Sequence, residues 1–163
     1  MATECSAIIE ILKTLIPTIA VVFGWVVVHK LSVTRDRDNA RRKMLVDASD
    51  AIMKNIDDIF ACSNKYHSTL RDKNIEITLK MSLQDLSYRI TQLIDITAND
   101  NEIKPCRNAM LEMKKAITMI HFEDEHDGPI DQKSQQIQTI AFTVLKLKQT
   151  FLKLKHSQFA VKK

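Results

Sequence analysis

The sequence predicts an all-α protein with one N-terminal transmembrane helix that continues into a small cytosolic helical domain. Three observations predict this class. A long apolar run near the N-terminus reaches the roughly 20 residues that a helix needs to cross a bilayer. The rest of the chain repeats apolar residues at three- and four-residue steps, which is helical periodicity. Only 2 glycines occur in the 163 residues, and signals for β-hairpin turns are absent.

The transmembrane helix is predicted over residues 7–29. No charged residue lies between Leu15 and Val28, and Trp25 lies near the inner end, where aromatic side chains anchor such helices at the interface. Pro17 is tolerated in a membrane helix because neighbouring helices or hydroxyl groups satisfy the freed carbonyl. The alternative for this run is a buried helix of a soluble core.

Charges on either side of the helix predict its orientation. Only Glu4 precedes the run, whereas basic residues concentrate after it: Lys30, Arg35, Arg37, Arg41, Arg42 and Lys43. Because an excess of Lys and Arg marks the cytoplasmic side, we expect residues 1–6 outside and the rest inside. Residues 30–43 then form a basic juxtamembrane collar that contacts anionic lipid. No signal-peptide cleavage site is recognisable, so the prediction is a retained single-pass protein of the inner (cytoplasmic) membrane.

Residues 44–163 are predicted to form one cytosolic helical domain. The membrane helix is expected to run on as a stalk that ends near Lys65, and a second helix covers residues 74–97. A polar loop over residues 98–102 precedes a third helix with Pro105 in its first turn. The fourth helix follows the turn at residues 127–129, with Asp131 or Ser134 as its cap. The expected core positions are Leu45, Ala48, Ile52, Ile56, Ile59, Leu79, Leu83, Leu86, Ile90, Leu93, Met110, Met113, Ile117, Ile120, Ile137, Ile140, Ala141, Val144 and Phe151.

No motif for catalysis is recognisable in the chain. Phosphate-binding glycine loops, zinc-protease signatures and nucleophile motifs are absent from the sequence, so we expect no enzyme, no catalytic residue and no cofactor. Cys5, Cys62 and Cys106 form no CxxC pair, and in the cytoplasm they are expected to be reduced thiols. Residues 121–127 combine histidines with carboxylates that are competent metal ligands, but a helix end explains them, and no metal is expected.

Charge is distributed unevenly along the cytosolic domain. By our count, residues 44–132 contain ten Lys or Arg against sixteen Asp or Glu, whereas residues 133–163 contain seven against none. Such an asymmetry indicates an anionic partner. The free N–H groups at a helix N-terminus, together with nearby basic side chains, form a site suited to phosphate. The candidate ligand-binding residues are Arg71, Lys73, Asn74, Lys104, Arg107, Asn108, Lys148 and Lys155.

The last two of these candidates lie on an apolar side of the fourth helix. The quartet Leu-Lys-Leu-Lys occurs twice, at residues 145–148 and 152–155, so that Lys148 and Lys155 fall on the side of Val144. A lysine there is costly unless its amine reaches water or an anion. A symmetric homo-oligomer would multiply these lysines around its axis into a basic cavity. The alternative for every candidate is an ordinary surface charge.

The order of a membrane span, a basic collar and a compact helical domain, over Ala7 to Lys163, resembles the small membrane-anchored effectors of type III CRISPR antiviral defence. The resemblance is one of architecture, and no binding residue is transferred from it. It implies a homo-oligomer whose cytosolic domain binds a cyclic oligoadenylate second messenger and then perturbs the lipid bilayer. Duplex nucleic acid is not an expected partner.

Two other functions fit the same features. One is a membrane-tethered adaptor whose helical domain docks a cytosolic protein. The other is a pore-forming, toxin-like protein that needs no nucleotide ligand.

Overall fold

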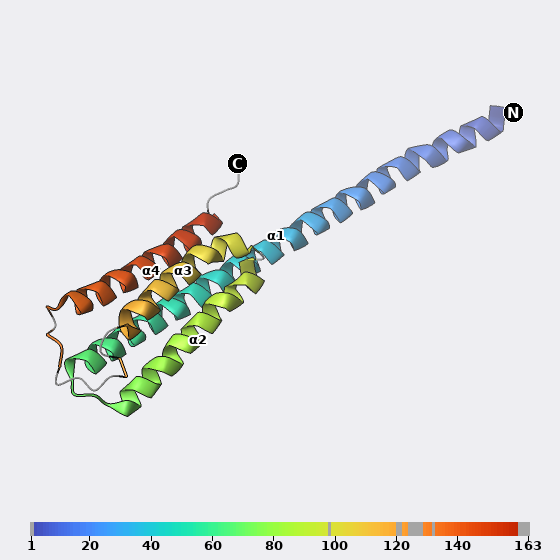
Figure 1. Cartoon of the computed structure of the whole chain (residues 1–163). Coiled ribbons are helices and arrows are strands. Elements are labelled where there is room, and N and C mark those ends of the chain that lie inside the picture. The colour runs from blue at the N-terminus through green and yellow to red at the C-terminus, as the bar shows by residue number, and fades with distance from the viewer. Residues whose placement is uncertain (1, 98, 120–121, 124–128, 132, 160–163) are drawn as a thin grey trace. The chain divides into compact units, whose positions relative to one another are not determined.

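The computed structural model describes residues 2–97, 99–119, 122–123, 129–131 and 133–159, and in this part of the chain it contains four helices and no strand. They are α1 (Ala2–Ser68), α2 (Lys73–Thr97), α3 (Asp100–Thr118) and α4 (Gln135–Phe159), as Figure 1 shows. The prediction of an all-α protein is confirmed. The contacts divide the chain into two units, Met1–Ala40 and Arg41–Lys163.

The first unit is the N-terminal part of α1. It contains a stretch that is long and apolar enough to span a membrane, and none of that stretch is buried. Large apolar side chains such as Phe23 (70% exposed) and Trp25 (67% exposed) are mostly exposed. Trp25 also stacks on His29 one turn later, with ring centroids 5.3 Å apart. An apolar surface of this size is unfavourable in water and favourable in lipid.

The second unit is a four-helix bundle in which successive helices run in opposite directions. The helices α1 and α4 are antiparallel, because the earlier aspartate, Asp50, pairs with the later lysine, Lys155. The later aspartate, Asp57, pairs with the earlier lysine, Lys148. Between α1 and α2, the guanidinium of Arg41 donates to the carbonyl oxygen of Ile96. The α2–α3 and α3–α4 pairs pack directly against each other.

One face of each helix fills the core of this bundle. Every expected core position that is described is buried except Ala48, Ile137 and Ala141, which are half-buried; Ile120 lies outside the described residues. The structure adds further buried side chains, including Tyr66, Ile103, Cys106, Leu147 and Leu154. The apolar spacing in the sequence therefore identified the core face of all four helices correctly.

The start of α3 differs from the prediction of a polar loop over residues 98–102. The helix begins at Asp100, because the Asn99 side chain accepts a hydrogen bond from the backbone N–H of Asn101 at 3.1 Å. The side-chain amide of Asn99 also donates to the Glu102 carboxylate at 3.0 Å, while the backbone N–H of Asn99 is bonded to the Thr97 hydroxyl. As a result Pro105 lies inside the helix, one turn later than expected.

The caps of α2 and α4 show why these helices begin where they do. A carboxylate oxygen of Asp72 accepts the backbone N–H of Asn74 at 2.8 Å, at the start of α2. The hydroxyl of Ser134 accepts the N–H of Ile137 at 3.4 Å, so Ser134 is the cap of α4. Asp131 forms the preceding turn instead. The first two residues of the expected turn at 127–129 lie outside the described part of the chain.

Candidate functional site

The eight predicted ligand-binding residues lie in three separate places on one chain. Residues 71–74 lie at the end of the bundle where α1 is joined to α2. Residues 104–108 lie at the opposite end, on the first turns of α3, because consecutive helices are antiparallel. Lys148 and Lys155 lie along the edge between α4 and α1. Within a single chain these groups do not form one site, and their role in ligand binding stays a prediction.

Two parallel ion pairs hold α4 against α1. Lys148 Nζ lies 2.5 Å from Asp57 Oδ1, and Lys155 Nζ lies 2.6 Å from Asp50 Oδ1. The lysine side chains are 30% and 20% exposed. Both the aspartates and the lysines are seven residues apart, so each pair repeats after two helical turns. The anion that a lysine at these positions requires is thus supplied by the chain itself.

These ion pairs give a test of what the two lysines do. We expect the double variant Lys148→Gln/Lys155→Gln to remain folded and to lose about 1 kcal/mol or less of bundle stability, because partly exposed pairs contribute little. Glutamine is the cleaner change, since glutamate would place like charges beside Asp57 and Asp50. Chemical unfolding followed by circular dichroism measures the effect. The exposed Lys153→Gln is the matched control, and an equal loss in this control would contradict a specific α1–α4 contact.

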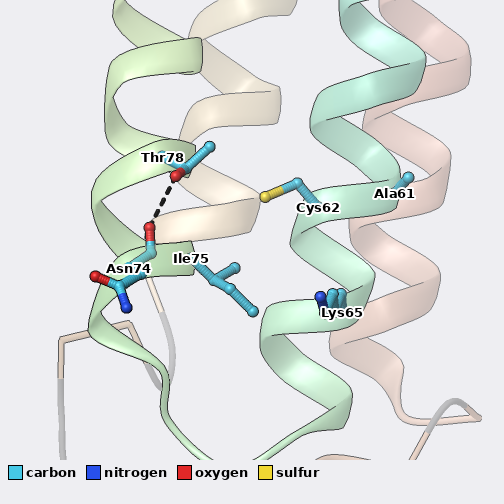
Figure 2. Close-up of a pocket in the computed structure, with 6 residues that line it drawn as sticks. All are labelled: Ala61, Cys62, Lys65, Asn74, Ile75 and Thr78. Carbon is cyan, nitrogen blue, oxygen red and sulfur yellow. Dashed lines mark hydrogen bonds between the residues drawn. The ribbon is translucent and has the colours of Figure 1, made fainter.

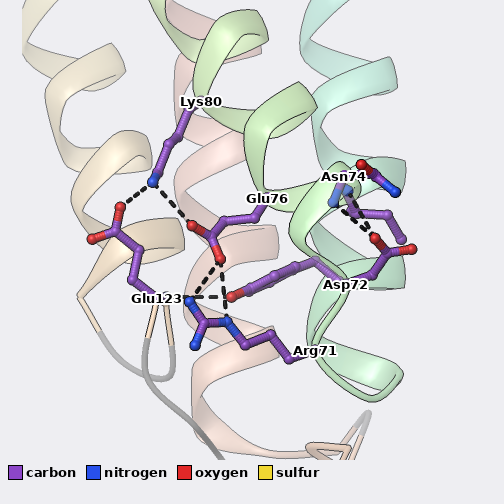
Figure 3. A network of polar contacts seen from close by, with 8 residues as sticks. Arg71, Asp72, Asn74, Glu76, Lys80 and Glu123 are labelled. Carbon is purple, nitrogen blue, oxygen red and sulfur yellow. Dashed lines mark hydrogen bonds and ion pairs between the residues drawn. The ribbon is translucent and has the colours of Figure 1, made fainter.

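Arg71 belongs to a network of charges at the α1–α2 end of the bundle. Its guanidinium donates to Glu76, with Nη2 3.2 Å from the carboxylate oxygen, and Lys80 Nζ lies 3.0 Å from the other oxygen (Figure 3). Lys80 also pairs with Glu123, which ties the segment after α3 to α2. Glu76 is only 7% exposed, so its charge depends on both cations. Arg71 is therefore part of this network, and a ligand at this place would share its guanidinium with Glu76.

The network predicts how stability changes in acid. Hydrogen bonds from Lys80 and, less strongly, Arg71 lower the pKa of Glu76 below its usual value, although burial opposes the shift. A carboxyl with a lowered folded pKa stabilises the fold above its unfolded pKa of about 4.3, and this contribution is lost as the pH falls through the folded pKa. Glu76→Gln is therefore expected to be less stable than the original chain at pH 7, by a margin that shrinks below about pH 4. Unfolding curves between pH 7 and 3 measure the margin.

One variant controls for this pH effect. Lys80→Met removes the hydrogen bond from Lys80 to Glu76. In this variant, the further change Glu76→Gln should lower the free energy of unfolding at pH 7 by less than it does in the original chain. If the difference in unfolding free energy between the original chain and Glu76→Gln stayed the same from pH 7 to pH 3, the role assigned to this carboxylate would be contradicted.

The first turns of α3 already contain their own anions. Asp100 and Glu102 lie in the first turn, where carboxylates interact favourably with the helix dipole. Arg107 Nη2 lies 2.6 Å from Asp100 Oδ1. Lys104 and Asn108 are exposed one turn apart. A phosphate at this helix N-terminus would have to compete with two carboxylates.

A shallow groove lies between α1 and α2, with a volume of about 370 Å³ (Figure 2). Its lining residues are Ala61, Cys62, Lys65, Asn74, Ile75 and Thr78. Burial raises the pKa of the Cys62 thiol, and Lys65 only partly offsets this. A thiol with a raised pKa is mostly protonated at neutral pH and is a poor nucleophile. Of the candidate residues, Asn74 alone lines the groove.

The remaining thiol and metal candidates have structural explanations. Burial raises the pKa of Cys106 to about 11, which keeps this core thiol protonated. Cys62 and Cys106 are unbridged, while the side chain of Cys5 lies outside the described residues. In the cluster at residues 121–127, Glu123 pairs with Lys80, and both histidines lie outside the described part of the chain. Among the residues that the structure describes, no group of three His, Cys, Asp or Glu side chains is placed to hold a metal ion.

The sequence prediction missed an apolar line on the outer side of α4. In each Leu-Lys-Leu-Lys quartet the second leucine is buried, whereas the first, Leu145 or Leu152, is 54% or 45% exposed. Phe142, one turn earlier, is 67% exposed. The seven-residue repeat was the signal that could have revealed this second apolar face. Comparison of the chain with family models, curated proteins and solved structures found no significant match, so the fold and these surfaces are the evidence for function.

Proposed function

We propose that this chain is a membrane-tethered adaptor: a single-pass protein whose cytoplasmic four-helix bundle docks a soluble partner protein. The observation that carries the proposal is that the core of the bundle closes within one chain while two helices keep several exposed apolar side chains each, against single ones such as Leu111 on α3. On these two helices they are Ile77, Met81 and Tyr88 on α2 and Phe142, Leu145 and Leu152 on α4. Exposed apolar side chains that follow one another along a helix are typical of surfaces that bind another helix.

The N-terminal unit supports the membrane half of this proposal. None of its apolar stretch is buried in the chain by itself, and six Lys or Arg follow between residues 30 and 43. The positive-inside rule then places the bundle in the cytoplasm, and in a bacterium the membrane is the inner membrane. A single helix of this kind fixes a bundle at the bilayer surface, where a soluble partner is recruited.

Sensing of a cyclic oligoadenylate is the main competing hypothesis. The positions of the candidate residues favour the adaptor, because four of the cations have carboxylate partners in their own chain: Arg71, Arg107, Lys148 and Lys155. A messenger site would have to be assembled between copies, and its phosphates would share these cations with carboxylates of the chain. The messenger hypothesis therefore makes a distinct prediction, namely ligand binding coupled to oligomerisation.

One preparation separates the hypotheses. The full chain is purified in mild detergent from native membranes, its bound proteins are quantified, and it is then titrated calorimetrically with cyclic oligoadenylates of several ring sizes. A stoichiometric protein partner together with no nucleotide binding supports the adaptor. Tight binding of one ring size, with fewer ligands than subunits, would replace the adaptor with the messenger-gated effector. Growth arrest on overexpression without either ligand would indicate the toxin-like alternative.

A further inference from the structure

The outer face of α4 has the residue pattern of one strand of a coiled coil. Phe142, Leu145 and Leu152 are exposed, and they lie three and seven residues apart. A heptad has two seam positions, three residues apart. Phe142 and Leu145 occupy them in the first heptad of α4, and Gln149 and Leu152 occupy them in the second. Alternating three- and four-residue steps of this kind form the seam that packs against a partner helix. We call these four residues the outer seam.

Lysines occupy all the positions that border the outer seam over two heptads. The quartet repeat places Lys146 and Lys153 on one side of the seam and Lys148 and Lys155 on the other. In coiled coils, the bordering positions select the partner and its orientation through interhelical ion pairs. A seam with lysine on both borders is complementary to a helix with glutamate or aspartate at its bordering positions.

The ion pairs within the bundle leave these lysines able to bind a second carboxylate. Their partners in the chain, Asp50, Asp57 and Glu112, lie on α1 and α3, behind the seam. An ammonium group has three donors. In this same bundle, Lys80 binds the carboxylates of Glu76 and Glu123 at once. Lys153 is exposed, and no carboxylate lies within ion-pair distance of it in the described part of the chain.

The bordering charges argue against a second copy of this chain as the occupant. In a pairing of two outer seams, lysines of one copy would face lysines of the other, and like charges across an interface suppress such pairing. The outer face of α2 is not bordered by charges of one sign. Ile77, Met81 and Tyr88 are bordered there by both signs of charge, including Asp85 and Arg89, which pair with each other at 2.6 Å.

We infer that the outer seam of α4 is a docking site for an amphipathic helix of another protein, with apolar residues at heptad spacing and acidic residues at the bordering positions. This inference rests on the proposed adaptor function and names the class of partner. Leu145 and Leu152 insert between the apolar side chains of the incoming helix, while the four lysines pair with its carboxylates. Gln149 in the seam fixes the register, as a polar residue at a seam position does in coiled coils.

The test uses the full chain in phosphatidylcholine nanodiscs and a fluorescent synthetic helix of three heptads, with leucine in the seam and glutamate at the bordering positions. A second peptide with lysine at the bordering positions is the charge control. Fluorescence anisotropy is expected to show saturable binding of the acidic peptide only. Leu145→Glu should weaken binding at least tenfold, and Lys153→Glu should weaken it several-fold. Ile77→Glu, an equally exposed site on α2, is the matched control and should leave affinity within twofold.

Several results would overturn the docking site. These are equal binding of both peptides, affinity that survives Leu145→Glu, or an equal loss in Ile77→Glu. Self-association of the full chain that disappears in Leu145→Glu would instead assign the seam to a second copy. A native partner that stays bound when Leu145→Glu abolishes peptide binding would remove the docking site but leave the adaptor function standing. Circular dichroism is recorded for each variant, and an unchanged helix content shows that the bundle of that variant is still folded.

Discussion

Replacing Phe151 with alanine is expected to lower the free energy of unfolding of the bundle by about 3–5 kcal/mol, the usual cost of truncating a buried phenylalanine. The ring of Phe151 is fully buried, on the face of α4 that meets the other helices. Truncation removes apolar contacts and leaves a cavity that the neighbouring side chains fill only in part. Because small domains have only about 5–15 kcal/mol of stability in total, this single change should remove a large share of it.

The adjacent residue supplies the control for this prediction. Leu152 is 45% exposed on the outer seam, so Leu152→Ala should change stability by about 0.5 kcal/mol or less, as surface substitutions usually do. Urea unfolding of the full chain in detergent, followed by the helical circular dichroism signal, compares the two variants. Similar losses for both, or a larger loss for Leu152→Ala, would mean that the core face of α4 has been assigned to the wrong side.

Replacing Val22 with arginine is expected to prevent stable insertion of the N-terminal helix into the membrane. Val22 lies in the middle of the uncharged stretch and is 55% exposed, so in a bilayer it would face lipid. An arginine near the centre of a transmembrane helix costs about 2.5–3.5 kcal/mol on insertion scales. The described residues contain no second helix apolar enough to share this cost in the membrane, so the variant should move largely to the soluble or aggregated fraction.

Val33→Arg is the matched control for insertion. Val33 is also an exposed valine of α1, but it lies within the basic collar, beyond the uncharged stretch. Alkaline carbonate extraction of membranes, followed by immunodetection, should find this variant in the membrane pellet like the original chain. Full retention of Val22→Arg in the pellet, or equal loss of both variants, would contradict a transmembrane role for this helix.

The sequence was a good guide to helix interiors and a weaker one to helix ends. Spacing alone identified the buried side of α2, because Leu79, Leu83 and Leu86 repeat at three- and four-residue steps and all are buried. The start of α3 was placed too late, because the asparagines and acids around residue 100 also suit a loop. Asn99 is the helix cap, and only the observed hydrogen bond from the Asn101 backbone N–H to its side chain distinguishes this cap from a turn.

The partners of the charged side chains were harder to predict. Asp50 and Asp57 lie on α1 and look like a solvated face by themselves, while Lys148 and Lys155 look like lysines in need of an anion. The matching seven-residue spacing of the two pairs is visible in the sequence. That they face each other depends on which helices are neighbours and in what register, and this is a property of the folded bundle. Local sequence therefore predicted the presence of charge but not what neutralises it.

The ion pairs between the first and last helices also join parts of the chain that are synthesised well apart in time. Their members are 91 and 105 residues apart in the chain, whereas the other pairs of adjacent helices follow one another directly. At translation rates of about 5–20 residues per second, α1 waits roughly 5–20 s for its last partner. During that interval the apolar residues of α1 that are buried in the complete bundle, such as Ile52 and Ile56, lack part of their cover. A chain that still lacks its last helix therefore exposes apolar surface on which chaperones and proteases can act.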